Sequence, residues 1–228
     1  MNIRILQLLE GAQKATGLTV IIDVFRAFSV EASLMACGVE KIIPVADIDL
    51  AYAYKAEDPS VVLVGERGGR ICEGFDYGNS PSQLEGADLK GKTVVHTTSA
   101  GTQGLFGAKN AAEILGVSLL NAKATAKYIA ASGYTDVSLV CMGLAGIENT
   151  EEDLLCAEYI KALLENKPYP LEEKIKDLQF TSGAKFFDPA QQEIFPEKDF
   201  HICTQVNRYD FVLKLVNPHQ SIPYIAKG

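Results

Sequence analysis

Charged and hydroxyl side chains collect in a long loop, residues 65–81, that follows a short apolar run at residues 61–64. Five glycines lie between its polar residues, which are Glu66, Arg67, Arg70, Glu73, Asp76, Asn79 and Ser80. Loops of this length inside compact domains are uncommon and usually functional. Carboxylates and guanidinium groups beside glycines suit a site where the backbone closes on a small, highly charged anion. The competing interpretation is a solvated surface loop.

Two other polar segments also follow apolar runs. Asp23 comes directly after residues 18–22, and Arg26 follows it. A carboxylate in that place can bind Mg²⁺ or attack phosphorus, and an arginine can clamp an anion, whereas the alternative is that Asp23 caps the next helix. Residues 97–102 place four hydroxyl groups and a glycine after the run 93–97. Such a turn can cradle phosphate or carboxylate, or it can be an ordinary Ser/Thr turn.

Residues 150–153 (TEED) allow two interpretations. Thr150 and Asp153 fit a capping box at the start of a helix, and acids in a first turn favour the helix dipole. That arrangement leaves Glu152 free, so the segment could also present a metal ligand. Residues 86–93 (GADLKGKT) match the phosphate-binding P-loop pattern, which requires a preceding strand and a following helix. Because a loop precedes this stretch and a strand is predicted after it, we interpret the match as chance.

The elements that must position these residues alternate between strands and helices. Short apolar runs predict strands at residues 3–8, 18–22, 41–45, 61–64, 93–97, 113–120 and 137–141, and helical patterns cover residues 27–37, 47–55, 122–132, 150–166 and 177–186. This alternation predicts a three-layer α/β/α fold with a mainly parallel or mixed sheet. We expect residues 1–228 to form one domain or two closely packed α/β subdomains. Ligands in such folds bind beyond the carboxyl ends of the strands, where the polar segments stand.

Composition excludes several classes of partner. The net charge of −8 and the absence of a basic stripe argue against nucleic acid. No apolar run is long enough to span a membrane, and the first residues do not resemble a signal peptide. Five scattered cysteines without a CxxC pair are typical of free thiols, so we expect a cytoplasmic protein. Three of the five arginines fall in the loops described above, which favours an anionic ligand.

Five separated segments together resemble the 2-phosphosulfolactate phosphatase family, whose members take part in coenzyme M biosynthesis. The segments are residues 23–27 (DVFRA), 65–67 (GER), 74–81 (GFDYGNSP), 97–102 (TTSAGT) and 152–154 (EDL). The resemblance implies a Mg²⁺-dependent acid phosphatase of α/β fold. Such an enzyme hydrolyses 2-phosphosulfolactate, or a related phosphorylated 2-hydroxy acid, to the hydroxy acid and phosphate.

Roles for individual residues follow from that resemblance. The expected Mg²⁺ ligands are Asp23, Glu66, Asp76 and one of Glu152 and Asp153, and the expected catalytic residues are Asp23, Glu66 and Arg67. The phosphoryl group would be held by Arg67 and by Thr97, Thr98, Ser99, Gly101 and Thr102. Arg26 or Arg70 would grip the carboxylate or sulfonate of the substrate, near Asn79 and Ser80.

Three questions stay open from the sequence. The nucleophile can be water on the metal or Asp23 itself. A binding protein that senses a phosphorylated or sulfonated acid, or a lyase or isomerase for hydroxy acids, would use a similar pocket. A homo-oligomer is compatible with the chain.

Overall fold

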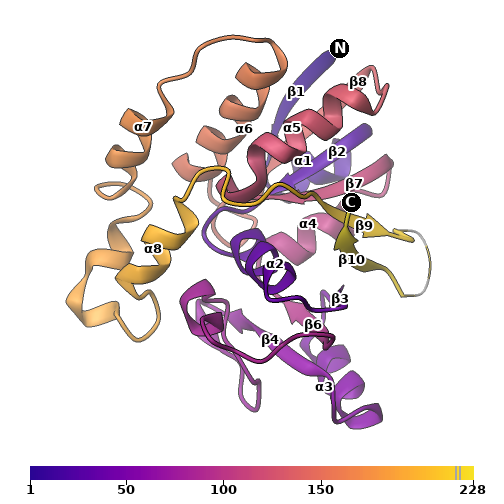
Figure 1. The fold of residues 1–228 in the computed structure, drawn as a ribbon, viewed down its shortest axis with the longest axis vertical. Coiled ribbons are helices and arrows are strands. Elements are labelled where there is room, and N and C mark those ends of the chain that lie inside the picture. Colours follow the sequence, from indigo (N-terminus) through magenta and orange to yellow (C-terminus); the bar gives the residue numbers. More distant parts are fainter. Residues whose placement is uncertain (219, 221) are drawn as a thin grey trace.

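The strands form one mixed sheet in the order β1-β8-β2-β7-β9-β10-β3-β6-β4-β5 (Figure 1). The computed structural model describes residues 1–218, 220 and 222–228. Within these residues the strands are β1 (Asn2–Gln7), β2 (Gly17–Ile22), β3 (Lys41–Pro44), β4 (Val62–Arg67), β5 (Arg70–Ile71), β6 (Thr93–Thr97), β7 (Ala111–Val117), β8 (Asp136–Cys141), β9 (Leu213–Val216) and β10 (Tyr224–Lys227).

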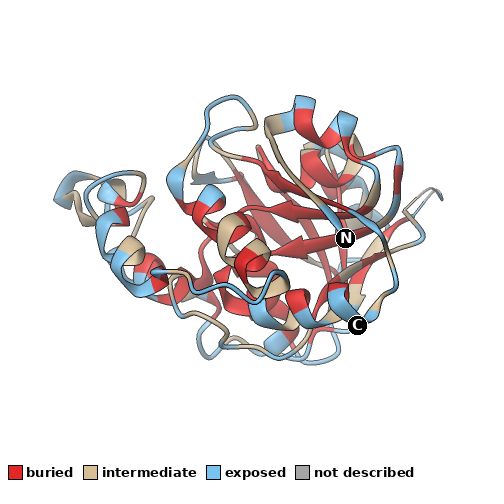
Figure 2. Cartoon of the chain, turned by 90° about the horizontal axis from the view of Figure 1, so that it is seen from above, coloured by how far each residue is buried: buried red, intermediate tan, exposed pale blue. Residues whose placement is uncertain are grey.

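Helices cover both faces of this sheet. The α-helices are α1 (Leu8–Lys14), α2 (Ala27–Ala36), α3 (Ile48–Glu57), α4 (Gly101–Gly107), α5 (Ala122–Ala131), α6 (Glu151–Leu164), α7 (Leu171–Leu178) and α8 (Glu197–Cys203). Short 3₁₀ helices are η1 (Pro81–Leu84), η2 (Leu119–Asn121), η3 (Ala184–Phe187) and η4 (Pro189–Gln191). Figure 2 shows the strands buried between the helices, so the predicted three-layer α/β/α architecture is confirmed.

Alternating side chains of the strands pack into two hydrophobic cores, one on each face of the sheet. Ile21 on β2 packs with α2 and α4 on one face, whereas Val20 and Ile22 pack with α5 and α6 on the other. All three side chains are fully buried, and each contributes roughly 1.5–3 kcal/mol of transfer free energy. Burial on both faces explains why these strands are continuous apolar runs in the sequence.

Two parallel blocks of strands run in opposite directions. The block β1-β8-β2-β7 is joined to the block β3-β6-β4 through β9 and β10 by three antiparallel pairings. Three reversals make the second block antiparallel to the first, so a flat sheet would put their carboxyl ends at opposite edges. Right-handed twist of roughly 20–25° per pairing accumulates over the five pairings from β2 to β6 and turns the carboxyl ends of β6 and β4 toward that of β2.

Most predicted elements before residue 166 are confirmed within a few residues, and the predictions after it are less accurate. The helix expected at residues 177–186 is wrong, because α7 ends at Leu178 and a turn region leads to η3. The Leu178 carbonyl accepts from the N–H groups of Thr181 and Gly183, at 3.2 and 2.8 Å, so the chain turns here and the helical hydrogen-bond pattern does not continue. The sequence analysis also missed α1, α4 and α8, and it expected only short elements of unspecified type after residue 200, where β9 and β10 lie.

A buried acid–base pair joins α2 to β6. The Glu31 carboxylate Oε1 lies 2.9 Å from His96 Nδ1, and both side chains are fully buried. Burial raises the pKa of Glu31, and the hydrogen bond and charge of His96 act in the opposite direction. The pair therefore ties α2, which begins shortly after Asp23, to β6, which ends at Thr97.

Candidate active site

A cavity of about 310 Å³ lies where the carboxyl ends of four strands meet. Its lining comes from residues at the end of or after β2, β4, β6 and β8, together with residues of the later segment 185–199, called the C-terminal segment here. The residues that line it are Asp23, Phe25, Arg26, Glu66, Gly68, Gly69, Asn79, Thr98, Ser99, Ala100, Gly143, Leu144, Ala145, Lys185 and Phe195. The structure therefore brings the polar segments before residue 150 to one place.

Asp23 occupies the floor of this cavity and is only 6 % exposed. Its Oδ1 accepts a hydrogen bond of 3.1 Å from the Ala27 backbone N–H, at the start of α2. Burial raises the pKa of Asp23 to about 7, against the Ala27 hydrogen bond and with help from the negative charges of Glu152 and Glu66. Among the described residues, Oδ2 accepts no hydrogen bond. Asp23 thus holds the start of α2 with one oxygen, keeps the other free of hydrogen bonds, and lines the cavity.

Asp153, in the first turn of α6, holds two strand-end loops together. Its carboxylate accepts hydrogen bonds of 2.8 Å from the backbone N–H groups of Val24 and Gly143. Burial, with the charges of Glu152 and Asp23, raises the pKa of Asp153 well above its usual range. The predicted capping box is wrong, because the Thr150 side chain makes no cap and Asp153 bonds other segments. Both Asp153 oxygens are therefore already used by the fold.

Glu66 joins the β4–β5 turn to the turn after β6. Its Oε1 accepts from the Ser99 N–H and its Oε2 from the Gly69 N–H, both at 2.7 Å. The Ser99 hydroxyl also reaches Oε2, at 3.3 Å. Glu66 is 6 % exposed and lines the cavity, so this carboxylate shapes the site and adds negative charge beside Asp23.

The hydroxyl-rich turn after β6 is ordered by its own side chains. Thr98 and Thr102 exchange hydrogen bonds, in which each backbone N–H donates to the other's Oγ1. Gly101 lies so close to α2 that a Cβ there would be 2.7 Å from the Ala27 Cβ and 3.0 Å from Asp23 Oδ2. Thr98, Ser99 and Ala100 line the cavity, whereas Thr97, Gly101 and Thr102 support the turn from behind.

Arg26 lines the cavity but its charge is already paired. Its Nη1 lies 2.7 Å from Asp199 Oδ2 and donates to the Ile194 carbonyl at 2.9 Å. Arg26 and Asp199 are both buried, and the guanidinium lies 4.9 Å from the centre of the Phe195 ring. Arg26 therefore braces the C-terminal segment against the strand ends.

The other two predicted arginines face away from the cavity. Arg67 donates to the Glu66 carbonyl at 2.6 Å and to Thr97 Oγ1 at 2.8 Å. Arg70 lines a separate hollow of about 70 Å³, with Asn79 and Ser80. Arg26, Gly69 and Asn79 border both hollows.

Asp76, a predicted metal ligand, and Ser80, a predicted substrate-binding residue, support the surrounding loops. The Asp76 carboxylate lies 3.1 Å from Lys55 Nζ and accepts from the Leu63 N–H at 2.8 Å, so it closes the long loop onto β4. The Ser80 hydroxyl donates to Asp199 Oδ1 at 2.9 Å. Neither residue lines the cavity.

Several residues of the site were missed by the sequence analysis. Lys185 and Phe195 form the wall opposite the strand ends, and Asp199 holds Arg26 in place. Lys185 lies in the region where the helix prediction is wrong, Phe195 and Asp199 follow it, and no motif spacing marks any of the three. The signal that could have found them is the apolar pair Phe186–Phe187 after Gly183 and Lys185, which indicates a short anchored segment.

The acidic part of the site has the chemistry of a cation site. Glu152 is 3 % exposed, its Oε2 has no hydrogen-bond partner among the described residues, and burial raises its pKa. Glu152 does not line the cavity, but its charge acts on Asp23, and such a pair of carboxylates suits Mg²⁺, which needs as few as one or two. Over the described part of the chain, no three His, Cys, Asp or Glu side chains form a ready metal-binding group.

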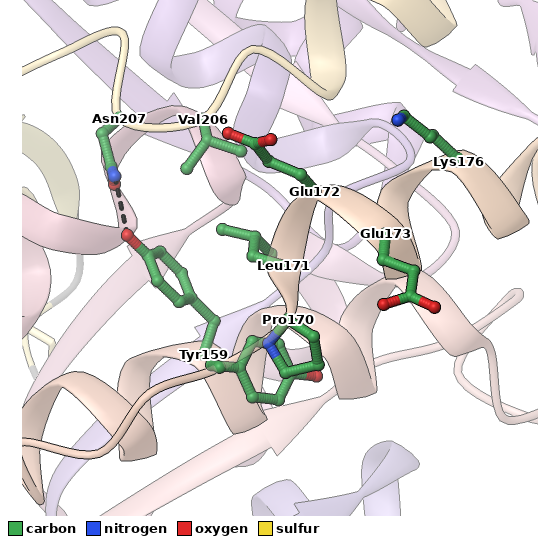
Figure 3. A pocket seen from close by; sticks show the side chains of 9 residues that line it. Tyr159, Pro170, Leu171, Glu172, Glu173, Lys176, Val206 and Asn207 are labelled. Carbon is green, nitrogen blue, oxygen red and sulfur yellow. Dashed lines mark hydrogen bonds between the residues drawn. The ribbon is translucent and has the colours of Figure 1, made fainter.

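A larger hollow lies elsewhere, between α6, α7 and the residues after α8 (Figure 3). This groove of about 790 Å³ is lined by Tyr159, Tyr169, Pro170, Leu171, Glu172, Glu173, Lys176, Val206 and Asn207. Its charged side chains are exposed, and none of the predicted site residues lies in it. Within the described ranges, no helix is both long and apolar enough to cross a membrane.

Comparisons with known proteins match most of the chain. A family model described as 2-phosphosulpholactate phosphatase matches residues 4–218. Three similar proteins, each named "Probable 2-phosphosulfolactate phosphatase", come from Bacillus subtilis, Caldicellulosiruptor saccharolyticus and Thermoplasma volcanium. Their identities to this chain are 32 %, 44 % and 32 %. The matches cover 92 %, 65 % and 86 % of this chain, and 91 %, 63 % and 88 % of the respective relatives.

Proposed function

The chain belongs to the 2-phosphosulfolactate phosphatase family, and from this premise we propose that it is a Mg²⁺-dependent phosphatase for a phosphorylated 2-hydroxy acid. The best candidate substrate is 2-phosphosulfolactate, which would yield sulfolactate and phosphate. The observation that carries the proposal is Asp23, a buried carboxylate with a raised pKa and one free oxygen, in a cavity at the strand ends.

The cavity suits the phosphate end of such a substrate. Asp23 lines the same space as Thr98, Ser99 and Ala100, so a phosphate there would touch the hydroxyl-rich turn and the carboxylate. Water adds to phosphorus, the P–O ester bond breaks, and the hydroxy acid leaves with a proton. The turn is fixed by Glu66, so its groups are oriented before the substrate arrives, which is the condition for electrostatic stabilisation of a transition state.

Asp23 and Glu152 are the residues that would hold Mg²⁺. The ion would neutralise charge on the phosphoryl oxygens as the ester bond breaks. Without a cation, Asp23, Glu152 and Asp153 repel one another, and this repulsion contributes to the raised pKa values of Asp23 and Asp153. Asp153 orients the loops that carry Val24 and Gly143.

Phosphate release from a panel of phosphorylated 2-hydroxy acids tests this function. We expect release that requires Mg²⁺ and stops in EDTA, with 2-phosphosulfolactate among the best substrates. Turnover that persists in EDTA would contradict the metal requirement. If no panel member releases phosphate, the phosphatase assignment is wrong.

A further inference from the structure

Lys185 is a cation of the cavity that no carboxylate neutralises. Arg26, the other cation in the lining, is paired with Asp199 at 2.7 Å. No carboxylate among the described residues lies within salt-bridge distance of Lys185 Nζ, although its charge acts on Asp23 and Glu152. The ammonium group lies 5.2 Å from the centre of the Phe195 ring and 5.6 Å from that of Phe186. Lys185 is therefore available to an anion that enters the cavity.

The backbone that carries Lys185 is fixed in place. A Cβ at Gly183 would lie 2.6 Å from both the Leu178 carbonyl oxygen and the Phe200 ring, so the chain is pressed against both. On the other side of Lys185, Phe186 is fully buried among aromatic rings. These contacts hold the lysine at the cavity wall, which lowers the ordering cost of binding a ligand there.

Lys185 stands on the wall that does not come from strand ends. A phosphate that reaches Asp23 and the Thr98–Ala100 turn lies at the strand-end wall, so the rest of a small substrate faces the C-terminal segment. We propose that Lys185 binds the second acidic group, a carboxylate or sulfonate, of a small phosphate monoester. This inference rests on the proposed phosphatase function and replaces Arg26 and Arg70 as the residues expected to grip that group.

The proposal predicts selectivity for esters that carry two acidic groups. Without substrate, the charge of Lys185 acts on the buried carboxylate of Asp23, but no carboxylate pairs with it among the described residues. A ligand with a neutral tail would leave the ammonium group without an anion, and part of its hydration would be lost. A ligand with a second acid replaces those lost contacts with a charge-assisted hydrogen bond.

A matched pair of substrates tests this role. 2-Phospholactate and isopropyl phosphate share a phosphorylated secondary carbon, and only the first has a carboxylate. We expect Lys185→Gln to lower kcat/KM for 2-phospholactate by about 10- to 100-fold, the value of one hydrogen bond to a charged group, and to change kcat/KM for isopropyl phosphate less than about threefold. Lys185→Arg should restore much of the loss, and Lys176→Gln, in the distant groove, should change neither rate.

Other outcomes overturn the proposal in distinguishable ways. An equal loss on both esters would show that Lys185 acts on the phosphate or on the fold, and no loss on either would show that it binds nothing. If the wild type hydrolyses neither ester, calorimetric binding of the same two compounds still tests Lys185, while the substrate panel tests the proposed function separately. Lys185→Gln must then weaken the binding of 2-phospholactate only. Equal weakening of the binding of both compounds, or no weakening of either, would contradict the inference.

Discussion

The cavity at the strand ends and the groove beside α7 differ in the surroundings of their charged side chains. Asp23 and Glu66 in the cavity are each 6 % exposed, whereas Glu172, Glu173 and Lys176 in the groove face solvent. The groove is larger, at about 790 Å³ against about 310 Å³. Electrostatic interactions are much stronger where water is excluded, so volume is a poor guide to chemistry here and buried charge is the better one.

The two regions also differ in how they are assembled. Neighbouring elements α6 and α7, with the loop after α8, build the groove. Segments more than 100 residues apart build the cavity, since Val24 is hydrogen-bonded to Asp153 and Arg26 to Asp199. A site made this way depends on the whole fold, and its residues should respond to substitution far more strongly than those of the groove.

Removing the charge of Asp23 should give the largest effect. We expect Asp23→Asn to lower phosphate release at least about 10³-fold, because the cavity loses its free carboxylate oxygen while the Ala27 cap can be kept by the amide oxygen. Asp76→Asn is the matched control, because its carboxylate lies outside the cavity. Comparable losses in the two variants would contradict the separation of Asp23 from Asp76.

Glu66→Gln should lower turnover by about 10²-fold. The amide can still accept one hydrogen bond, but its NH₂ group would face a backbone donor, the N–H of Gly69 or Ser99, so the turn after β6 loses its fixed position. Glu73→Gln, an exposed residue of the same loop, is the control and should keep full activity. Steady-state phosphate release measures both variants, and an active Glu66→Gln would mean that the turn does not need this brace.

Buried charge should also make the metal-free protein less stable at high pH. The pKa of Asp23 rises from 3.8 to about 7 on folding, so the folded state binds more protons between these values and its free energy of unfolding falls as pH increases through that window. Asp23→Asn removes this penalty, on the order of 2 kcal/mol after local relaxation.

Thermal unfolding in EDTA measures that penalty. The variant should melt about 5 °C above the wild type at pH 8, and the difference should disappear near pH 4, where Asp23 is protonated in both states. If the wild type is instead more stable than the variant at pH 8, the charge of Asp23 does not lower the free energy of unfolding.

The groove should give the smallest effect. Tyr159→Phe removes the hydroxyl that accepts a hydrogen bond of 2.8 Å from Asn207 Nδ2, which should cost about 1 kcal/mol of unfolding free energy and leave turnover unchanged (Figure 3). Urea unfolding and phosphate release check the two parts. A loss of activity beyond about threefold would make the groove part of the functional site.

Much of the fold could be predicted because each inner strand is buried on both faces. Residues 18–22, 93–97 and 137–141 are continuous apolar runs for that reason, and their ends mark where the polar residues emerge. The same pattern could not predict the helix limits after residue 166, where Gly183 and Phe200 pack against each other through contacts that leave no periodic signal.

The sequence by itself determined where the polar segments at residues 23–26, 65–80 and 97–102 stand, since each follows an apolar strand that the core must bury. It did not determine that they meet, because their strands belong to two antiparallel blocks, nor that Lys185 and Phe195 join them. Only the tertiary structure decided what each charge does. It binds Arg26 to Asp199, uses both oxygens of Asp153 and of Glu66 in holding loops, and leaves Asp23 and Lys185 open to the cavity. The reason is that local pattern reports the burial of an element, whereas the partner of a buried charge comes from a distant part of the chain.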